Sequence, residues 1–248
     1  MSGHSKWSTI KRKKGAADAK RGKIFSKLSK EITVAAKEGG GGDPEMNPRL
    51  RLAIQNAKGS NMPKDNIERA IKKGSGADGD SYMEMTFEGY GPNGIGVFVE
   101  CLTDNQNRTV QNIRAAFNKY GGNLGTNGSL EFIFERKGIF SIEQPENLDM
   151  EEFELEAIDA GAEEFELSDG YINISCAMED FGNLNKKLEE MEIATESAEL
   201  QRIPNTSVVL ADDAFEKVMK LIDALEDEDD VQKVYHNIDI SDEQAESI

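Results

Sequence analysis

The spacing of apolar residues changes near residue 80, and this change limits the folds that the chain can adopt. Before it, apolar residues recur every three or four positions, as in Phe25, Leu28 and Ile32, which is typical of an amphipathic helix. After it, stretches in which apolar residues alternate, such as 94–102, are interleaved with stretches of helical spacing. The pattern therefore predicts a helical segment followed by mixed segments of helices and strands.

The first 76 residues are expected to form three helices. A helix over about 16–38 is followed by a run of glycines at 39–42, which ends it. A second helix begins near Pro48, and a third begins at Pro63, because proline is tolerated at the first helical position. The small residues at 74–76 predict a linker after the third helix.

The order of elements in the remaining residues predicts two α/β domains. Residues 138–204 read as strand, helix, strand, strand, helix and strand, which is the ferredoxin-like split βαβ pattern. Residues 81–137 predict a hairpin over 82–102, a helix at 110–120 and a strand at 130–134. The C-terminal helix and a strand near 231–238 are expected to complete that domain.

The predicted fold class is therefore α+β, with an N-terminal helical domain followed by two ferredoxin-like-type α/β domains, the third inserted in the second. The predicted domains are a basic helical domain over 1–76, an α/β domain over 77–137 plus 205–248, and a ferredoxin-like βαββαβ domain over 138–204.

Charge is divided between the same parts of the chain. The net charge is −18, yet residues 1–76 hold 18 basic and 7 acidic side chains, whereas residues 77–248 hold 11 basic and 40 acidic ones. A basic segment on an acidic protein indicates a polyanion as its partner. The alternative is that the basic segment neutralises the acidic remainder of the same chain.

The sequence contains none of the common catalytic or cofactor-binding motifs. Its two histidines, His4 and His236, lie in distant segments, and no Cys-x-x-Cys, His-Glu-x-x-His or Gly-x-Ser-x-Gly motif is present. The glycine runs at 39–42 and 121–125 lack the spacing of a phosphate-binding loop and are better explained as helix ends. We therefore expect a protein that is not an enzyme, with no catalytic residues, no cofactor and no metal site.

Cysteine usage and hydropathy predict a cytoplasmic protein with no membrane partner. Cys101 and Cys176 sit alone in separate apolar runs, which argues against a disulfide framework. No window approaches the length of apolar sequence that a bilayer span requires, and the first residues do not resemble a secretory signal.

Nucleic-acid binding is the activity that the basic segment favours, because Lys and Arg bind backbone phosphates. On a helical wheel of residues 16–38, the lysines gather opposite the apolar stripe and are expected to stay in water. The alternative for this lysine face is an ordinary solvated helix surface. Trp7 lies among the cations of the tail, where it either stacks on an unpaired base or packs on its own domain. The predicted contacts are Lys6, Trp7, Lys11, Arg12, Lys13, Lys14, Lys20, Arg21, Lys23, Lys27 and Lys30, with Arg49, Arg51, Lys64, Arg69, Lys72 and Lys73 in second place.

The acidic remainder of the chain limits how the basic segment can act. It repels a polyanion over a screening distance of about 8 Å at physiological salt. The basic segment is therefore expected to project from the acidic part by more than that distance. The acidic domains would then face outward, where they could meet a protein partner.

The second and third helices also have the outline of a helix-turn-helix. Their connection is short and contains Gly59, as such turns often do. However, Asp65 and Glu68 lie near the start of the helix that would read bases, where they would repel phosphate. An ordinary helical hairpin is the favoured interpretation.

Several stretches of the sequence resemble the YebC family. They cover most of residues 3–140 and continue more loosely to the C-terminus. They are Gly-His-Ser-Lys-Trp-Ser-Thr-Ile-Lys at 3–11, Asp-Ala-Lys-Arg-Gly-Lys-Ile-Phe at 18–25, Asn-Met-Pro-Lys-Asp-Asn-Ile-Glu-Arg-Ala-Ile at 61–71, Glu-Gly-Tyr-Gly-Pro at 88–92, Leu-Thr-Asp-Asn-Gln-Asn-Arg-Thr at 102–109 and Gly-Gly-Asn-Leu-Gly at 121–125.

The resemblance implies a three-domain cytoplasmic protein of the kind named probable transcriptional regulators, which bind DNA and have no enzyme activity. It also implies a competing role in translation, because relatives that include the mitochondrial translational activator of cytochrome oxidase subunit I are tied to the ribosome. The hypothesis is thus a non-catalytic nucleic-acid-binding regulator of gene expression. Its alternatives are a translation factor that binds ribosomal RNA and relieves stalling, and an acidic adaptor that binds proteins.

Overall fold

The computed structural model describes residues 18–39, 41–76, 81–145, 148–168 and 170–246, without the side chains of 18–20. The chain forms two compact units. Among the described residues, unit 1 comprises 18–30, 81–135 and 203–246, and unit 2 comprises 31–76, 136–202. The predicted α+β class is confirmed, since a helical region precedes two four-stranded sheets that contain antiparallel strand pairs. The predicted three-domain boundaries stay a prediction.

Unit 1 is built on a four-stranded sheet with the strand order β3-β1-β2-β9. Its strands are β1 (Met83–Tyr90), β2 (Gly96–Thr103), β3 (Asn123–Leu124) and β9 (Val231–His236), and each adjacent pair is antiparallel. The alternation in β2 places Val97, Val99 and Cys101 on one face, where they are buried. The β1–β2 hairpin closes through a short turn, η1 (Pro92–Gly94).

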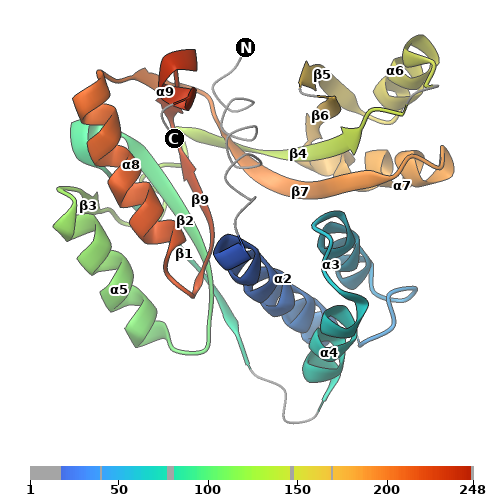
Figure 1. Ribbon diagram of the computed structural model, residues 1–248, viewed down its shortest axis with the longest axis horizontal. Coiled ribbons are helices and arrows are strands. Elements are labelled where there is room, and N and C mark those ends of the chain that lie inside the picture. The colour runs from blue at the N-terminus through green and yellow to red at the C-terminus, as the bar shows by residue number, and fades with distance from the viewer. Residues whose placement is uncertain (1–17, 40, 77–80, 146–147, 169, 247–248) are drawn as a thin grey trace. The chain divides into compact units, whose positions relative to one another are not determined.

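Two helices cover that apolar face side by side, as Figure 1 shows. They are α5 (Gln106–Lys119) and α8 (Asp212–Glu226). Phe117 of α5 and Ile222 of α8 have no exposed surface, so the helical spacing in both segments reflects burial in one core. Unit 1 also contains the first half of α2, the short parallel pair β8 (Val208–Val209) and β10 (Ile238–Asp239), and α9 (Asp242–Glu246).

Unit 2 contains the predicted ferredoxin-like arrangement. Its sheet has the order β5-β6-β4-β7, so that β6 lies between β4 and β5 as a split βαβ requires. Phe153 of α6 and Leu184 of α7 are buried in the core of this sheet. The elements are β4 (Phe134–Glu143), α6 (Met150–Asp159), β5 (Ala162–Ser168), β6 (Tyr171–Ala177), η2 (Met178–Asp180), α7 (Phe181–Glu190) and β7 (Thr195–Pro204).

The predicted helices of the N-terminal segment are present as α2 (Asp18–Glu38), α3 (Pro48–Gly59) and α4 (Lys64–Ser75). Pro63 is the N-cap of α4 and not its first helical residue. Asn47 caps α3 by accepting the Leu50 N–H at 3.0 Å, while its amide donates to the Ala35 carbonyl of α2 at 2.8 Å.

Within unit 2, α3 lies against the edge strand β7. The side chain of Asn56 donates to the Ala198 carbonyl and accepts the Ala198 N–H, both at 2.9 Å. It therefore pairs backbone groups that an edge strand otherwise leaves open. Gly59 permits this approach, because a Cβ there would lie 1.7 Å from the Glu196 carbonyl oxygen.

The predicted strand at 130–134 is wrong. Residues 127–133 form turns, and β4 begins only at Phe134. Leu130, Ile133 and Phe134 are buried against Phe98 and Tyr235, on a spacing of three and four residues that suits a turn. The short β3 takes the place of the predicted strand in the sheet of unit 1.

No helix among the described residues is long and apolar enough to cross a lipid bilayer.

Candidate nucleic-acid interface

A run of five acidic residues, 226–230, joins α8 to β9 and is called here the acidic turn. It contacts the first half of α2 within unit 1. Lys23, Lys27 and Lys30 of α2 are spaced by four and three residues, so their side chains lie on one face of the helix. The acidic turn therefore meets the lysine face that the sequence predicts as the phosphate-binding surface.

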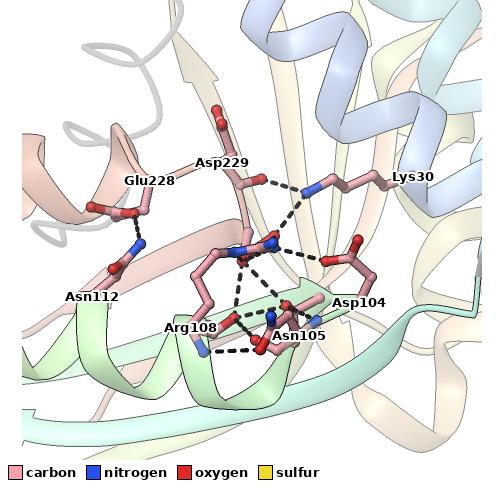
Figure 2. A network of polar contacts seen from close by, with 10 residues as sticks. Lys30, Asp104, Asn105, Arg108, Asn112, Glu228 and Asp229 are labelled. Carbon is pink, nitrogen blue, oxygen red and sulfur yellow. Dashed lines mark hydrogen bonds and ion pairs between the residues drawn. The ribbon is translucent and has the colours of Figure 1, made fainter.

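Each of the three lysines binds a different part of the acidic turn. Lys23 Nζ lies 2.8 Å from Asp227 Oδ1, and Lys27 Nζ donates to the Glu226 carbonyl at 3.2 Å. Lys30 Nζ donates to the Asp229 carbonyl at 2.6 Å and lies 3.2 Å from Asp230 Oδ1, and Figure 2 shows its contact with the turn. The expectations that these lysines stay in water and clear of the acidic part of the chain are therefore wrong. The physical reason is that oxygen atoms of the turn match the spacing of the helix.

Asp230 is the centre of this network. Its carboxylate accepts hydrogen bonds from Arg108 of α5, with Nη2 at 2.7 Å from Oδ2, and from the hydroxyls of Thr109 at 2.9 Å and Thr103 at 3.2 Å. With Lys30, four side chains from α2, β2 and α5 converge on one carboxylate. Asp230 thus links the lysine face of α2 to the start of α5.

The start of α5 is shaped to present Arg108 to this carboxylate. Asn105 is the N-cap and accepts the Arg108 N–H at 3.1 Å, which fixes the first turn of the helix. Asp104 binds the Arg108 guanidinium at 2.8 Å from the solvent side. One turn further along, Asn112 donates to Glu228 at 2.9 Å (Figure 2). Residues 102–109, which carry the Leu-Thr-Asp-Asn-Gln-Asn-Arg-Thr motif, therefore bind the acidic turn.

The charges in this network stabilise one another. Burial acts to raise the pKa of Asp230, but the hydrogen bonds from Arg108, Thr109 and Lys30 outweigh it and hold that pKa below its usual value. The hydrogen bond to Asp230 in turn raises the pKa of Arg108. Asp230 is therefore ionised at neutral pH and acts as an anchor for cations.

The ion pairs of Lys30 and Lys23 with the acidic turn differ in their exposure to solvent. The side chains of Lys30 and Asp230 are 18% and 8% exposed, whereas those of Lys23 and Asp227 are 35% and 80% exposed. An exposed ion pair contributes little free energy and is screened by salt. Lys23 is thus the lysine that another anion can most readily take over.

The remaining predicted cations are spread over several surfaces. Arg21 lies on the exposed side of α2. Arg49 pairs with Glu38 at 2.8 Å, and Arg51 is half-buried on α3. On α4, Lys64 lies 3.5 Å from Glu68, while Arg69, Lys72 and Lys73 are exposed. The residues Lys6, Trp7, Lys11, Arg12, Lys13 and Lys14 lie outside the described residues, as does the side chain of Lys20.

Sequence reasoning missed Asp230, Arg108, Thr103 and Thr109. The acidic turn was visible as a run of charge at 226–230, but such runs usually indicate solvated surface. Asp230, the last residue of the run, anchors the turn because it is buried. The signal in the sequence that indicates this burial is the apolar residue Val231, which follows it directly and is itself buried.

Among the described residues, potential metal ligands do not form a cluster, and both cysteines are buried. Within those residues, no group of three His, Cys, Asp or Glu side chains is arranged to hold a metal ion. Burial, followed by the charge of Asp230, raises the pKa of Cys101 to about 12, and burial likewise raises that of Cys176 to about 11. Both cysteines are therefore protonated at neutral pH and are weak nucleophiles.

Comparisons with known proteins find matches over nearly the whole chain. A family model described as "TACO1/YebC protein N-terminal domain" matches residues 5–77, and one described as "TACO1/YebC second and third domain" matches residues 82–238. A probable transcriptional regulatory protein of Amoebophilus asiaticus is 55% identical over 240 residues, which cover 96% of this chain and 98% of the relative. The probable transcriptional regulatory protein YrbC of Bacillus subtilis is 53% identical over 239 residues, which cover 96% of this chain and 99% of the relative.

The fold is also similar to a solved structure. The crystal structure of the conserved hypothetical protein Aq1575 from Aquifex aeolicus matches with a TM-score of 0.79 and 42% sequence identity. The match covers 91% of this chain and 93% of that one.

Proposed function

The chain belongs to the TACO1/YebC family, and from this premise we propose that it is a non-catalytic regulator of gene expression that binds nucleic acid through its basic N-terminal segment. Its relatives carry the name probable transcriptional regulatory protein, which supports a regulatory role. The proposal includes no chemical step.

The observation that carries the proposal is the division of charge along the chain. Residues 1–76 hold 18 basic and 7 acidic side chains, on a protein whose net charge is −18. An acidic protein gains no general affinity for nucleic acid from its overall charge, so binding depends on a local cationic surface. The run Lys11-Arg12-Lys13-Lys14 is the densest group of cations in the sequence and is the proposed centre of that surface.

The network around Asp230 supports the proposal by fixing the helix that follows this run. The helix α2 begins at Asp18, four residues after Lys14, and Lys30 ties it to the buried carboxylate of Asp230. The described part of α2 that follows the basic run in the sequence is thus attached to the rest of unit 1. The exposed cations of α4, Arg69 and Lys72, offer further phosphate contacts in the second-place set.

The proposal is tested by reversing the charge of the basic run in the full chain. Changing Lys11, Arg12, Lys13 and Lys14 to Glu is expected to weaken binding of a labelled oligonucleotide by at least about 100-fold at moderate salt, because phosphate contacts dominate affinity. The matched control reverses four cations elsewhere, namely Arg114, Lys186, Lys217 and Lys220, all exposed on α5, α7 and α8. Equal loss in the two variants would show that only net charge matters and would overturn the proposed surface.

The class of nucleic acid is decided with three probes in the same assay. Duplex promoter DNA, single-stranded RNA and purified ribosomes are compared at two salt concentrations. A preference for duplex DNA supports a role in transcription, and a preference for RNA or ribosomes supports a role in translation. Absence of salt-dependent binding to all three probes would refute the proposal.

A further inference from the structure

The acidic turn offers the α2 lysines the same kind of ligand that a nucleic-acid backbone offers. The turn presents oxygen atoms at successive positions, and three lysines on one helix face bind them at 2.6–3.2 Å. Two of the contacted oxygens belong to carboxylates and two to backbone carbonyls. A phosphate backbone also presents closely spaced oxygens to Lys and Arg, and these oxygens are anionic, as the two carboxylates of the turn are.

We propose that the acidic turn at residues 226–230 is an internal competitor that masks the lysine face of α2 and is displaced in part when nucleic acid binds. This inference rests on the proposed function and adds a mechanism of regulation to it. A polyanion that binds the basic run meets Lys23, Lys27 and Lys30 next along the chain, where the oxygens of the turn compete with its phosphates for these lysines.

The burial of the contacts determines the order of displacement. Lys23 is released first, because its partner Asp227 is 80% exposed and their ion pair is screened by salt. Lys30 stays bound, because it shares the buried carboxylate of Asp230 with Arg108 and both threonines. The first half of α2 therefore keeps its attachment to the rest of unit 1 while Lys23 changes partner.

The mask weakens the binding of nucleic acid and favours ligands that make many phosphate contacts. Asp230 is the buried anchor of the turn. The other four acidic side chains repel phosphate close to the lysine face. A ligand with few phosphates cannot replace these contacts, whereas a long nucleic acid held by the basic run can. The turn thus opposes general coating of nucleic acid by the protein.

The test neutralises the exposed part of the turn and leaves its anchor intact. The variant Glu226→Gln, Asp227→Asn, Asp229→Asn keeps Asp230, Glu228 and every backbone carbonyl. It is expected to bind a 20-nucleotide probe at least about threefold more tightly than the wild type at 150 mM salt, with a log–log salt slope steeper by about one ion. The matched control, Glu151→Gln, Glu152→Gln, Asp159→Asn, changes net charge equally on the exposed side of α6.

A substitution of Lys23 tests the mask at a single residue. Lys23→Gln is expected to change affinity less than twofold in the wild type, where Lys23 is bound to Asp227, and to weaken binding about threefold or more in the neutralised variant. Equal effects of Lys23→Gln in both backgrounds would overturn the inference.

The outcomes separate this inference from the proposed function. If the wild type binds and the turn variant gains no more than the control variant, the mask is refuted while the proposed function stands. If neither the wild type nor the turn variant binds the probe, both are refuted. Binding of the probe by the turn variant alone would overturn this inference, because nucleic acid would then fail to displace the turn in the wild type.

Discussion

Replacing Asp230 by alanine is the sharpest test of the network that attaches the first half of α2 to the rest of unit 1. The carboxylate is 8% exposed and accepts hydrogen bonds from four side chains. Its removal leaves the hydroxyls of Thr103 and Thr109 bonded to each other at 2.7 Å. Arg108 keeps Asp104 at 2.8 Å and is partly in solvent.

The expected loss follows from these partners. A hydrogen bond to a charged group contributes about 1.5–3 kcal/mol, but the bonds around one carboxylate do not add independently. Removal also cancels the cost of burying the carboxylate, which is the largest single influence on the pKa of Asp230. We therefore expect Asp230→Ala to lower the free energy of unfolding by about 2–4 kcal/mol, and the unfolding temperature by on the order of 10 °C.

Urea unfolding followed by circular dichroism measures this loss, with Asp229→Ala as the matched control. Asp229 carries the same charge one residue earlier, but its side chain is exposed and its backbone carbonyl is the group that binds Lys30. Asp229→Ala is therefore expected to cost less than about 0.5 kcal/mol. Asp230→Asn, which keeps the shape but not the charge, should fall between the two. A loss for Asp230→Ala no larger than that for Asp229→Ala would refute the anchoring role.

Two further predictions concern the loss of stability at low pH and the role of the buried Glu88. Because the pKa of Asp230 is lower in the folded state than in the unfolded state, its stabilisation is complete above the ordinary Asp pKa of about 3.9 and is lost as pH falls through the lower folded value. Urea midpoints measured from pH 6 to pH 2.5 should therefore fall less steeply in Asp230→Asn than in the wild type, and parallel curves would contradict this assignment. Glu88 accepts the N–H groups of Gly128 and Leu130, each at 2.7 Å, so Glu88→Ala should cost about 2–3 kcal/mol and speed hydrogen exchange at those two amides. Glu131→Ala, an exposed acid on the same turn, is the control, and unchanged protection of both amides in Glu88→Ala would refute the role of Glu88.

Much of the fold follows from the periodicity of the sequence, because buried residues recur at the period of the helix or strand that carries them. The alternation in 94–102 predicts β2, and its apolar members are buried in the core of unit 1. The spacing of Phe181, Leu184 and Leu188 predicts α7, whose inward residues are buried. The family resemblance, which rests on local motifs, is likewise confirmed by the matches over residues 5–77 and 82–238.

The turn at 127–133 shows why the strand predicted at 130–134 was wrong. A run of apolar residues fits a strand or a turn equally well when only its neighbours in sequence are considered. The decision comes from Glu88, a residue about 40 positions away, whose carboxylate takes up two backbone N–H groups that a strand would direct elsewhere. A contact between residues so distant in sequence leaves no periodic signal.

The lysine face of α2 was harder to interpret, because the sequence does not show which charges meet. A helical wheel places Lys23, Lys27 and Lys30 opposite the apolar stripe, and the prediction that this face lies in water follows only if nothing else covers it. The partner that covers it lies about 200 residues away, in a run of acids that composition alone assigns to solvent. Both halves of the contact were visible, and their pairing was not.

Burial is what gives the acidic turn two different roles within five residues. At Asp230 the carboxylate is largely buried, so it holds its cations firmly, and exchange with another anion would break hydrogen bonds from four side chains at once. At Asp227 the carboxylate lies in solvent, so its ion pair with Lys23 is weak and another anion can replace it at little cost. A uniformly exposed turn could not attach the helix, and a uniformly buried one could not release a lysine. The gradient of exposure along the turn therefore allows α2 to remain attached while part of its cationic face becomes available to phosphate.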